Sequence, residues 1–185
     1  MPPDTRTRLP VLTVNVAALL RSTPGTTRRY PVADLHLDMG GDLLQAEPIA
    51  GVVRLTRTNR GILVDGTLKT ALEESCGRCL APVVTPVEVQ LREEALPTID
   101  IETGQPVDVN EEPDALRIDD RHVLDLGQPV RDAISLAEPM TVLCRATCAG
   151  LCAVCGRDLN LEPHRHEREP DPRLAPLARL LAEKE

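Results

Sequence analysis

Cysteine and histidine side chains gather in two short stretches of this 185-residue chain. The first stretch is Cys76-Gly77-Arg78-Cys79. The second holds the other four cysteines and two histidines: Cys144, Cys148, Cys152, Cys155, His164 and His166. Thiolate sulfur and imidazole nitrogen are the donors that zinc prefers, and a structural site takes four of them in a tetrahedron. These eight donors therefore predict two zinc ions.

Spacing divides the donors into a local set and a long-range set. The local set is Cys152, Cys155, His164 and His166. In an extended segment, side-chain direction repeats every two residues, so the two histidines point the same way and can close on one ion. The long-range set is Cys76, Cys79, Cys144 and Cys148, with 64 residues between its two halves. A metal bound there would pin the end of a sheet to the C-terminal region.

Glycine and arginine accompany each C-x2-C pair. Gly77 and Gly156 are placed to permit turns in which backbone N–H groups point at the sulfurs. Arg78 and Arg157 add positive charge, which favours thiolate over thiol.

The donor count predicts structural zinc, because two four-coordinate sites leave no open position for a substrate or a catalytic water. The alternative is a set of buried thiols or a redox pair. Redox C-x2-C motifs usually open a helix in a βαβ unit, whereas Cys76 is predicted to follow an antiparallel strand. His36 and His122 are predicted to be ordinary surface or strand residues. A phosphate-binding glycine loop with its lysine and an H-E-x-x-H motif are both missing, so no catalytic residue is predicted.

Composition argues against several function classes. Tyr30 is the only aromatic residue, which excludes a base-stacking nucleic-acid platform. The net charge of −8 is opposite to that of a globally basic polyanion binder. No apolar run approaches the roughly 20 residues of a membrane span, and the N-terminus is a poor signal peptide. We therefore expect a cytoplasmic protein, in which cysteines are more often metal ligands than disulfides.

Charge also indicates the organisation of the chain. Residues 1–80 carry 10 basic and 8 acidic side chains, residues 81–143 carry 4 and 14, and residues 144–185 carry 7 and 7. Acids are densest from Glu93 to Asp120, a stretch with three prolines that is typical of a solvated loop. The expected division is a sheet region over 1–96, an acidic loop over 97–121, and a strand, a helix and the metal module over 122–185.

Hydrophobic periodicity predicts an α+β fold, with strands first and helices later. The predicted elements are a strand at 12–16, a helical turn at 17–21, a loop at 22–30, a hairpin of 51–58 and 62–72, strands at 83–91 and 122–126, and a helix at 127–137. Pro86 indicates an edge strand or a bulge. A second helix is expected near the C-terminus, where Leu174, Leu177, Leu180 and Leu181 form an apolar stripe.

At these residues the chain resembles the YceD family of large-ribosomal-RNA-subunit accumulation proteins. The matching pieces are NVAALLRSTPGTTRRY, SCGRCLAPV, EPMTVLCRATCAGLCAVCGRDLN and DPRLAPLARLL. The chain departs from the family pattern at His164 and His166, where many relatives are expected to carry C-x-C. The resemblance implies a cytoplasmic factor needed for accumulation or maturation of large-subunit ribosomal RNA. It also implies an association with a small zinc-containing ribosomal protein.

Three hypotheses follow from these observations. The first is a non-catalytic ribosome-assembly factor with structural zinc, whose partners are large-subunit ribosomal RNA precursor or ribosomal proteins. Its arginines would contact RNA, or its acidic 93–120 segment would hold a basic protein. The second is an enzyme, either a zinc hydrolase acting on RNA or a thiol oxidoreductase. The third is a zinc-ribbon DNA binder, which is weakened by the lack of a basic recognition helix. None of the three involves a membrane or a small-molecule substrate.

Overall fold

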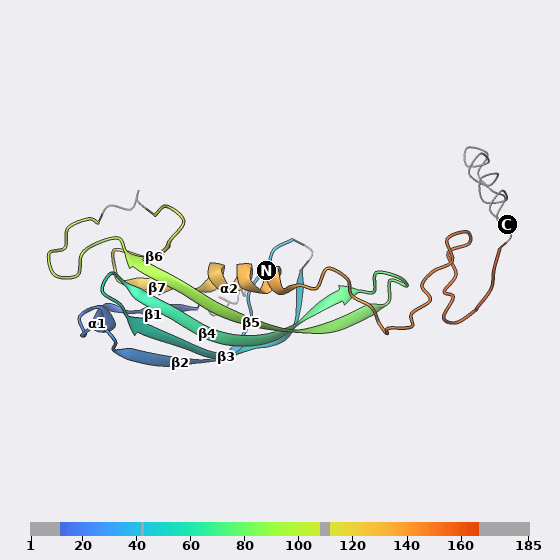
Figure 1. The fold of residues 1–185 in the computed structure, drawn as a ribbon, viewed down its shortest axis with the longest axis horizontal. Helices are drawn as coiled ribbons and strands as arrows, with labels where there is room; N and C mark the ends of the chain where they lie inside the picture. Colours follow the sequence, from blue (N-terminus) through green and yellow to red (C-terminus); the bar gives the residue numbers. More distant parts are fainter. Residues whose placement is uncertain (1–11, 42, 108–111, 167–185) are drawn as a thin grey trace, which may run out of the picture.

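Seven strands form one curled, half-barrel sheet in this computed structural model, which describes residues 12–41, 43–107 and 112–166 (Figure 1). Their order across the sheet is β1-β7-β6-β5-β4-β3-β2. The strands are β1 (Thr13–Asn15), β2 (Thr27–Leu35), β3 (Leu44–Arg57), β4 (Ile62–Ser75), β5 (Pro82–Pro97), β6 (Leu116–Ile118) and β7 (Val123–Asp125). The helices are α1 (Ala17–Leu20) and α2 (Gly127–Ala137).

The long strands β3, β4 and β5 form an antiparallel meander at the centre of the sheet. Their buried side chains are aliphatic and alternate with exposed polar ones along β5, where Val87, Val89 and Leu91 are buried. This alternation is what a strand with one covered face requires. β5 pairs with β6 in parallel, and only over Ala95–Pro97. The sheet is therefore mixed, although its central pairings are antiparallel.

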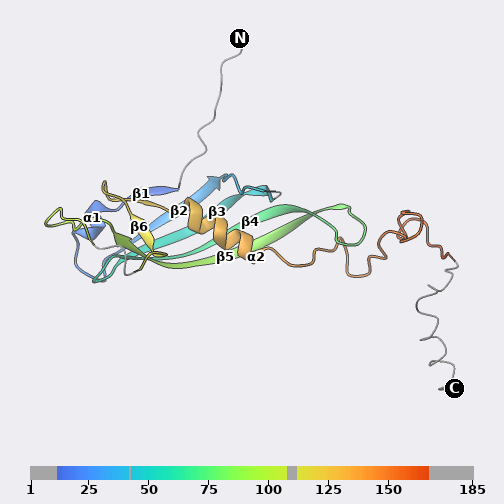
Figure 2. The same ribbon diagram turned by 90° about the horizontal axis from the view of Figure 1, so that it is seen from above.

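Helix α2 packs its apolar stripe into the core and runs beside β5 (Figures 1 and 2). Val130 and Ile134 are fully buried, and Leu19 and Leu20 of α1 join the same core. The predicted bounds of this helix, 127–137, are confirmed. None of the described helices is long and apolar enough to cross a membrane.

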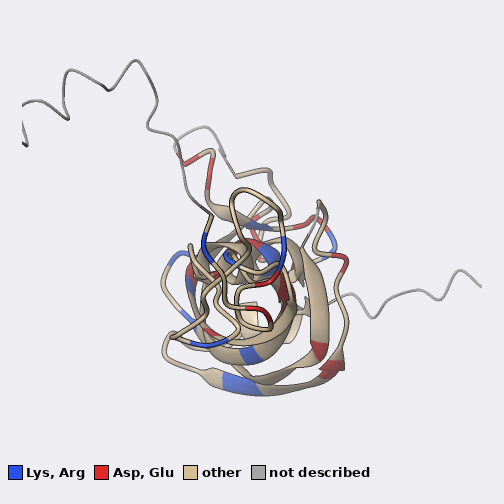
Figure 3. Ribbon diagram, turned by 90° about the vertical axis from the view of Figure 1, so that its right-hand side faces the viewer, with Lys and Arg blue, Asp and Glu red and all other residues tan. Residues whose placement is uncertain are grey.

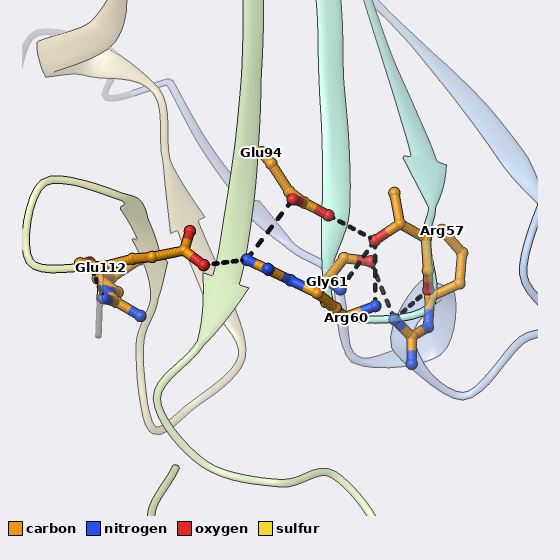
Figure 4. Close-up of polar contacts among 7 residues, drawn as sticks. Arg57, Arg60, Gly61, Glu94 and Glu112 are labelled. Atoms are coloured by element: carbon orange, nitrogen blue, oxygen red, sulfur yellow. Dashed lines mark hydrogen bonds and ion pairs between the residues drawn. The ribbon is translucent and has the colours of Figure 1, made fainter. Parts of the chain in front are cut away.

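The β3–β4 turn ties basic residues of the first half of the chain to the acidic segment (Figure 4). The Arg60 guanidinium lies 2.6 Å from a carboxylate oxygen of Glu112 and 3.8 Å from one of Glu94. The hydroxyl of Thr58 donates to Glu94 and accepts a hydrogen bond from the Gly61 N–H. Each exposed ion pair contributes little by itself. Together they join the β3–β4 turn to the acidic segment at Glu94 and Glu112.

The predicted α+β class is right about the order of elements but overstates the helix, because the described part of the chain is mostly β. The predicted loop at 22–30 is wrong from Thr27 onward, where β2 begins. β3 starts at Leu44 rather than at residue 51, and β6 lies inside the segment predicted to be an acidic loop. The predicted C-terminal helix falls outside the described residues.

Two short strands were placed correctly from sequence. The predicted strand at 12–16 is β1, and the predicted strand at 122–126 is β7. These two strands pair with each other, so the first and last parts of the sheet meet at its edge. Residues 139–166 then leave α2 without a further helix or strand and run to the end of the β4–β5 hairpin (Figure 1). That end of the sheet holds the cysteines.

Candidate metal centres

Four sulfurs meet where the β4–β5 hairpin contacts the chain after α2. We call this group the hairpin cluster; it consists of Cys76, Cys79, Cys144 and Cys148, and its sulfurs all lie within 4.8 Å of one another. The Cys76 and Cys148 sulfurs are 3.9 Å apart, and those of Cys79 and Cys144 are 3.6 Å apart. Four sulfurs at about 2.3 Å from a central zinc would be separated by about 3.8 Å. The observed separations fit that tetrahedron and exceed the roughly 2.05 Å of a disulfide bond.

The turn that carries Cys76 and Cys79 is closed by two backbone hydrogen bonds. The Cys76 N–H donates to the Ala81 carbonyl at 2.8 Å, and the Leu80 N–H donates to the Cys76 carbonyl at 2.9 Å. Leu80 has a left-handed backbone with φ of 61°. The turn directs several N–H groups toward sulfur, which is the local geometry that the C-x2-C spacing predicts.

Hydrogen bonds to the sulfurs divide the hairpin cluster into thiols with a lowered pKa and thiols with a raised pKa. Backbone N–H groups of Cys144, Cys79 and Arg78 lower the pKa of the Cys76 thiol to about 6. In contrast, hydrogen bonds with the Cys79 and Cys148 sulfurs raise the pKa of Cys144. Four thiolates this close repel one another, so a bound divalent cation is what would let all four ionise. The chemistry of the donor set therefore fits zinc.

Asn160 supports the hairpin cluster although it comes later in the chain than all four cysteines. Its side-chain amide donates to the Cys148 sulfur at 3.5 Å, while its carbonyl oxygen accepts from the Ala149 N–H at 2.8 Å and from Arg145 at 2.6 Å. Burial raises the pKa of Cys148, but hydrogen bonds from Asn160 and the Gly150 N–H outweigh it and lower the pKa. Sequence reasoning missed this role. The only available signal was the position of Asn160 at the end of the quoted CGRDLN run.

Contacts around Arg78 fasten the second half of the hairpin cluster to the first. The Arg78 guanidinium donates to the Cys148 carbonyl at 2.8 Å, and the Arg78 carbonyl accepts from the Leu151 N–H at 3.0 Å. Gly150 packs so closely that an added Cβ would lie 2.9 Å from the Arg78 carbonyl oxygen. A further bond runs from the Gly77 N–H to the Val142 carbonyl at 2.8 Å. Arg78 thus holds backbone together in addition to placing charge near sulfur.

The remaining donors form a second group, the terminal cluster, which consists of Cys152, Cys155, His164 and His166. Their ligand atoms also lie within 4.8 Å of one another, and the Cys155 sulfur is 3.1 Å from His164 Nε2. Backbone N–H groups of Cys155 and Val154 lower the pKa of the Cys152 thiol to about 6. His164 Nδ1 lies 2.7 Å from the Glu162 carbonyl oxygen, which raises the pKa of the ring and turns Nε2 toward the cysteines.

The cysteine turn of the terminal cluster repeats that of the hairpin cluster. The Cys152 N–H donates to the Arg157 carbonyl at 2.7 Å, and the Gly156 N–H donates to the Cys152 carbonyl at 2.8 Å. Gly156 has φ of 73° and occupies the position that Leu80 takes in the other turn. Arg157 lies 3.0 Å from Glu162, so its charge is partly engaged in an ion pair.

The structure thus brings the eight candidate ligands together in the two predicted sets. His36 and His122 belong to neither, and the described residues contain no further group of three metal-binding side chains of this kind. Gly156 does take the left-handed conformation of a tight turn, but in the first turn that conformation falls on Leu80 rather than on Gly77.

Comparison with known proteins identifies the family. Residues 64–181, which include both clusters, match the family model described as large ribosomal RNA subunit accumulation protein YceD. The chain belongs to the YceD family. Three of the four pieces that suggested this resemblance lie within the matched range, and the piece over Asn15–Tyr30 lies before it.

Mycobacterial proteins extend the YceD similarity toward the N-terminus. Uncharacterized proteins of Mycobacterium tuberculosis and Mycobacterium bovis are each 40% identical over 175 residues, which cover 92% of this chain and 81% of theirs. An uncharacterized protein of Mycobacterium leprae is 35% identical over 136 residues, covering 73% of this chain and 60% of its own. No solved structure matches the chain.

Proposed function

We propose that this YceD-family chain is a non-catalytic cytoplasmic factor that supports accumulation or maturation of large-subunit ribosomal RNA and carries two structural zinc ions. The family match supports the process, because the family is named for large ribosomal RNA subunit accumulation. The observation that carries the zinc assignment is the grouping of eight donors into two four-member clusters.

Each cluster would hold one ion with all of its four side chains. In the hairpin cluster Cys76 and Cys148 are buried, and backbone N–H groups converge on the sulfurs, so the site is prepared for thiolates. In the terminal cluster the Glu162 carbonyl orients His164 as a nitrogen donor. Bound zinc supplies four strong bonds that cross-link loops which contain no helix or strand of their own.

A structural role is favoured over a catalytic one by the donor sets. Four protein ligands fill a tetrahedral zinc ion, whereas catalytic zinc keeps a position for water or substrate. A thiol oxidoreductase would need an accessible low-pKa cysteine. Cys76 has a lowered pKa but is fully buried, and the half-buried Cys152, whose pKa is also lowered to about 6, lies within a group of four metal donors rather than beside one resolving thiol. These features support a scaffold that presents a surface to its partners.

The proposed partners are large-subunit ribosomal RNA precursor or ribosomal proteins. Figure 3 looks along the sheet from the cysteine end and shows basic residues spread over the loops among acidic ones. Arg78, Arg145 and Arg157 near the clusters already bond to other groups of the chain. Exposed Arg28 and Arg29 on the outermost strand β2 are the better candidates for contact with phosphate.

The test combines metal analysis with an affinity pull-down of the full chain from cells grown with zinc. We expect about two zinc ions per chain, protection of all six thiols, and enrichment of large-subunit ribosomal RNA precursor or ribosomal proteins. Arg28→Gln/Arg29→Gln should reduce RNA recovery, whereas Arg131→Gln on α2 serves as the matched control. Metal-free protein with a reversible Cys76–Cys79 disulfide, or a pull-down without ribosomal components, would contradict the proposal.

A further inference from the structure

Strand β5 has a long edge that no described strand covers. β4 pairs with it from Pro82 to Ala95, but β6 pairs with it on the other side only over Ala95–Pro97. The part of β5 before Ala95 therefore lies at an open edge in the middle of a seven-stranded sheet. A strand placed there would continue the line of β6. Open edges of this kind are templates for pairing with another extended chain.

Backbone direction identifies the groups that this edge offers. The backbone N–H and C=O groups of odd-numbered residues in β5 point toward β4, because a Cβ at Gly61 would lie 2.1 Å from the Ala95 carbonyl oxygen. The backbone groups of even-numbered residues point away from β4, since the N–H of Thr98, just after β5, donates to the Ile118 carbonyl of β6. Direction alternates along a strand, so the N–H and C=O groups of Glu88, Gln90 and Arg92 face the open edge. No hydrogen bond within the described residues uses these groups.

Pro86 fits the same alternation. It pairs opposite Ala71 with no shift of register, so the bulge that sequence analysis allowed is absent from this pairing; β5 is not an edge strand of the sheet, but at Pro86 no described strand pairs with it on the side away from β4. An even-numbered proline directs its missing N–H to the open side, where the β4–β5 ladder loses nothing.

A groove of about 570 Å³ runs along this edge, with β5 as one wall and α2 as the other. All six consecutive residues from 88 to 93 line it, which is what an exposed backbone edge produces. Leu136 of α2 also lines it and is 88% exposed, with Ala133 and Ala137 beside it. Six residues of strand span about 20 Å, enough for a peptide segment of similar length.

The walls of the groove are acidic. Four carboxylates line it, and Arg92 is the single base among its lining residues: Glu88, Glu93, Asp114 and Asp132 are the acids. Lys69 lies 3.0 Å from Glu88, and Gln128 donates to Asp132. Glu93 and Asp114 have no side-chain partner among the described residues. This charge repels nucleic acid and attracts a basic polypeptide.

We propose that the groove between β5 and α2 binds an extended basic segment of a partner protein, which adds as a strand to the open edge of β5. Its backbone would pair with Glu88, Gln90 and Arg92, as in other cases of strand addition. Side chains of the segment on the face toward α2 would contact Leu136 and meet Glu93, whose side chain is on the same face as those of Val89 and Leu91, and lysine or arginine on the opposite face would meet Glu88. Binding here requires neither zinc nor RNA, so it stands or falls separately from the proposed function.

Binding is tested on the zinc-loaded full chain with a ten-residue peptide that alternates lysine and valine, followed by fluorescence anisotropy. A peptide that alternates glutamate and valine should bind about tenfold more weakly or not at all. Methylating the backbone nitrogens that would face β5 should also cost about tenfold, because it removes edge hydrogen bonds while keeping charge. Equal binding of the methylated peptide would contradict strand addition.

Variants of the chain test the same contacts from the other side. Gln90→Pro removes one backbone N–H from the open edge. Because Gln90 faces the same side of β5 as Pro86 does, the β4–β5 hydrogen bonds stay in place, and the variant should weaken binding about tenfold. Glu93→Gln/Asp114→Asn should weaken it by a similar factor that shrinks at high salt, whereas Asp34→Asn/Glu102→Gln outside the groove should not. Wild-type affinity in both groove variants would contradict the proposal.

Amide hydrogen exchange provides a readout that needs no variant. In the free protein the amides of Glu88, Gln90 and Arg92 should exchange fast, while those of Val87, Val89 and Leu91 are protected by β4. Added lysine–valine peptide should slow the first three only. Protection of the first three in the free protein would overturn the proposal, because the edge would then already be covered. Sedimentation would show whether a second copy or another part of the same chain covers it.

Discussion

The hairpin cluster and the terminal cluster use the same cysteine turn but sit in different surroundings. Both turns are closed by the same pair of backbone hydrogen bonds, and both lower the pKa of their first thiol to about 6. The hairpin cluster buries two of its cysteines and joins segments 65 or more residues apart. The terminal cluster lies within residues 152–166 and keeps Cys155 exposed. A short motif thus sets the ligand geometry, while the packing around it sets what a bound metal would stabilise.

The largest expected difference concerns the second cysteine of each turn. Cys79→Ser and Cys155→Ser should each lower the zinc content from about two ions to about one. Only Cys79→Ser should release the chain after α2 from the hairpin, so exchange of the Gly77 and Leu151 amides should rise about a hundredfold. If Cys155→Ser exposed those amides equally, the two clusters would form one cooperative unit and the distinction between them would fail.

A glycine substitution tests the close packing that is special to the hairpin cluster. At Gly150, with φ of +76°, an added Cβ would meet the Arg78 carbonyl oxygen at 2.9 Å. Gly150→Ala should lower the free energy of unfolding by about 2–3 kcal/mol, from backbone strain and steric overlap together. Gly104→Ala is the control, because Gly104 has φ of +70° and nothing within 4 Å of an added Cβ. It should cost about 1 kcal/mol in a chemical denaturation experiment, and an equal loss in both variants would exclude a role for the packing.

Asn160 tests whether the clusters are independent. It lies in sequence between ligands of the terminal cluster but bonds to the Cys148 sulfur of the hairpin cluster. Asn160→Ala should weaken zinc retention by the hairpin cluster about tenfold, measured by competition with a chelator. Leu161→Ala at the exposed neighbour should leave retention unchanged. Loss of metal from the terminal cluster alone would contradict this assignment.

The smallest effect is expected when the residues with left-handed backbone in the two turns, Leu80 and Gly156, are exchanged in type. Leu80 is 66% exposed and has φ of 61°, whereas the equivalent Gly156 has φ of 73°. Leu80→Gly should raise the free energy of unfolding by about 1 kcal/mol, because strain relief outweighs the little apolar burial that is lost. Gly156→Leu should lower it by about the same amount. Changes of the same sign in thermal denaturation of the two variants would show that the turns are not equivalent.

The same contrast explains how much of the molecule could be predicted. The helix over 127–137 and the division of the eight donors followed from periodicity and spacing, which are local properties. The β6 strand was missed because three residues within an acidic run become a strand only when β5 and β7 pair with them. The start of β2 at Arg28 and Arg29 was likewise predicted to be a loop, because it becomes a strand only when β3 pairs with it.

The support of the hairpin cluster could not be predicted for a related reason. Asn160, Gly150 and Arg78 act through contacts with residues 11 to 73 positions away, and neither their type nor their spacing in the sequence indicates those contacts. Metal donors are recognised by chemistry that each side chain carries by itself. Their supporting residues are ordinary until the chain is folded.

Zinc-edge X-ray absorption spectroscopy of the full chain tests the central claim most directly. One ion held by the four cysteines of the hairpin cluster and one held by two cysteines and two histidines should give an average first shell of three sulfurs and one nitrogen per zinc. The expected distances are about 2.3 Å for sulfur and about 2.0 Å for nitrogen. An oxygen ligand in that shell, or a nitrogen share that stays the same in the Cys155→Ser and Cys79→Ser variants, would contradict two closed structural sites.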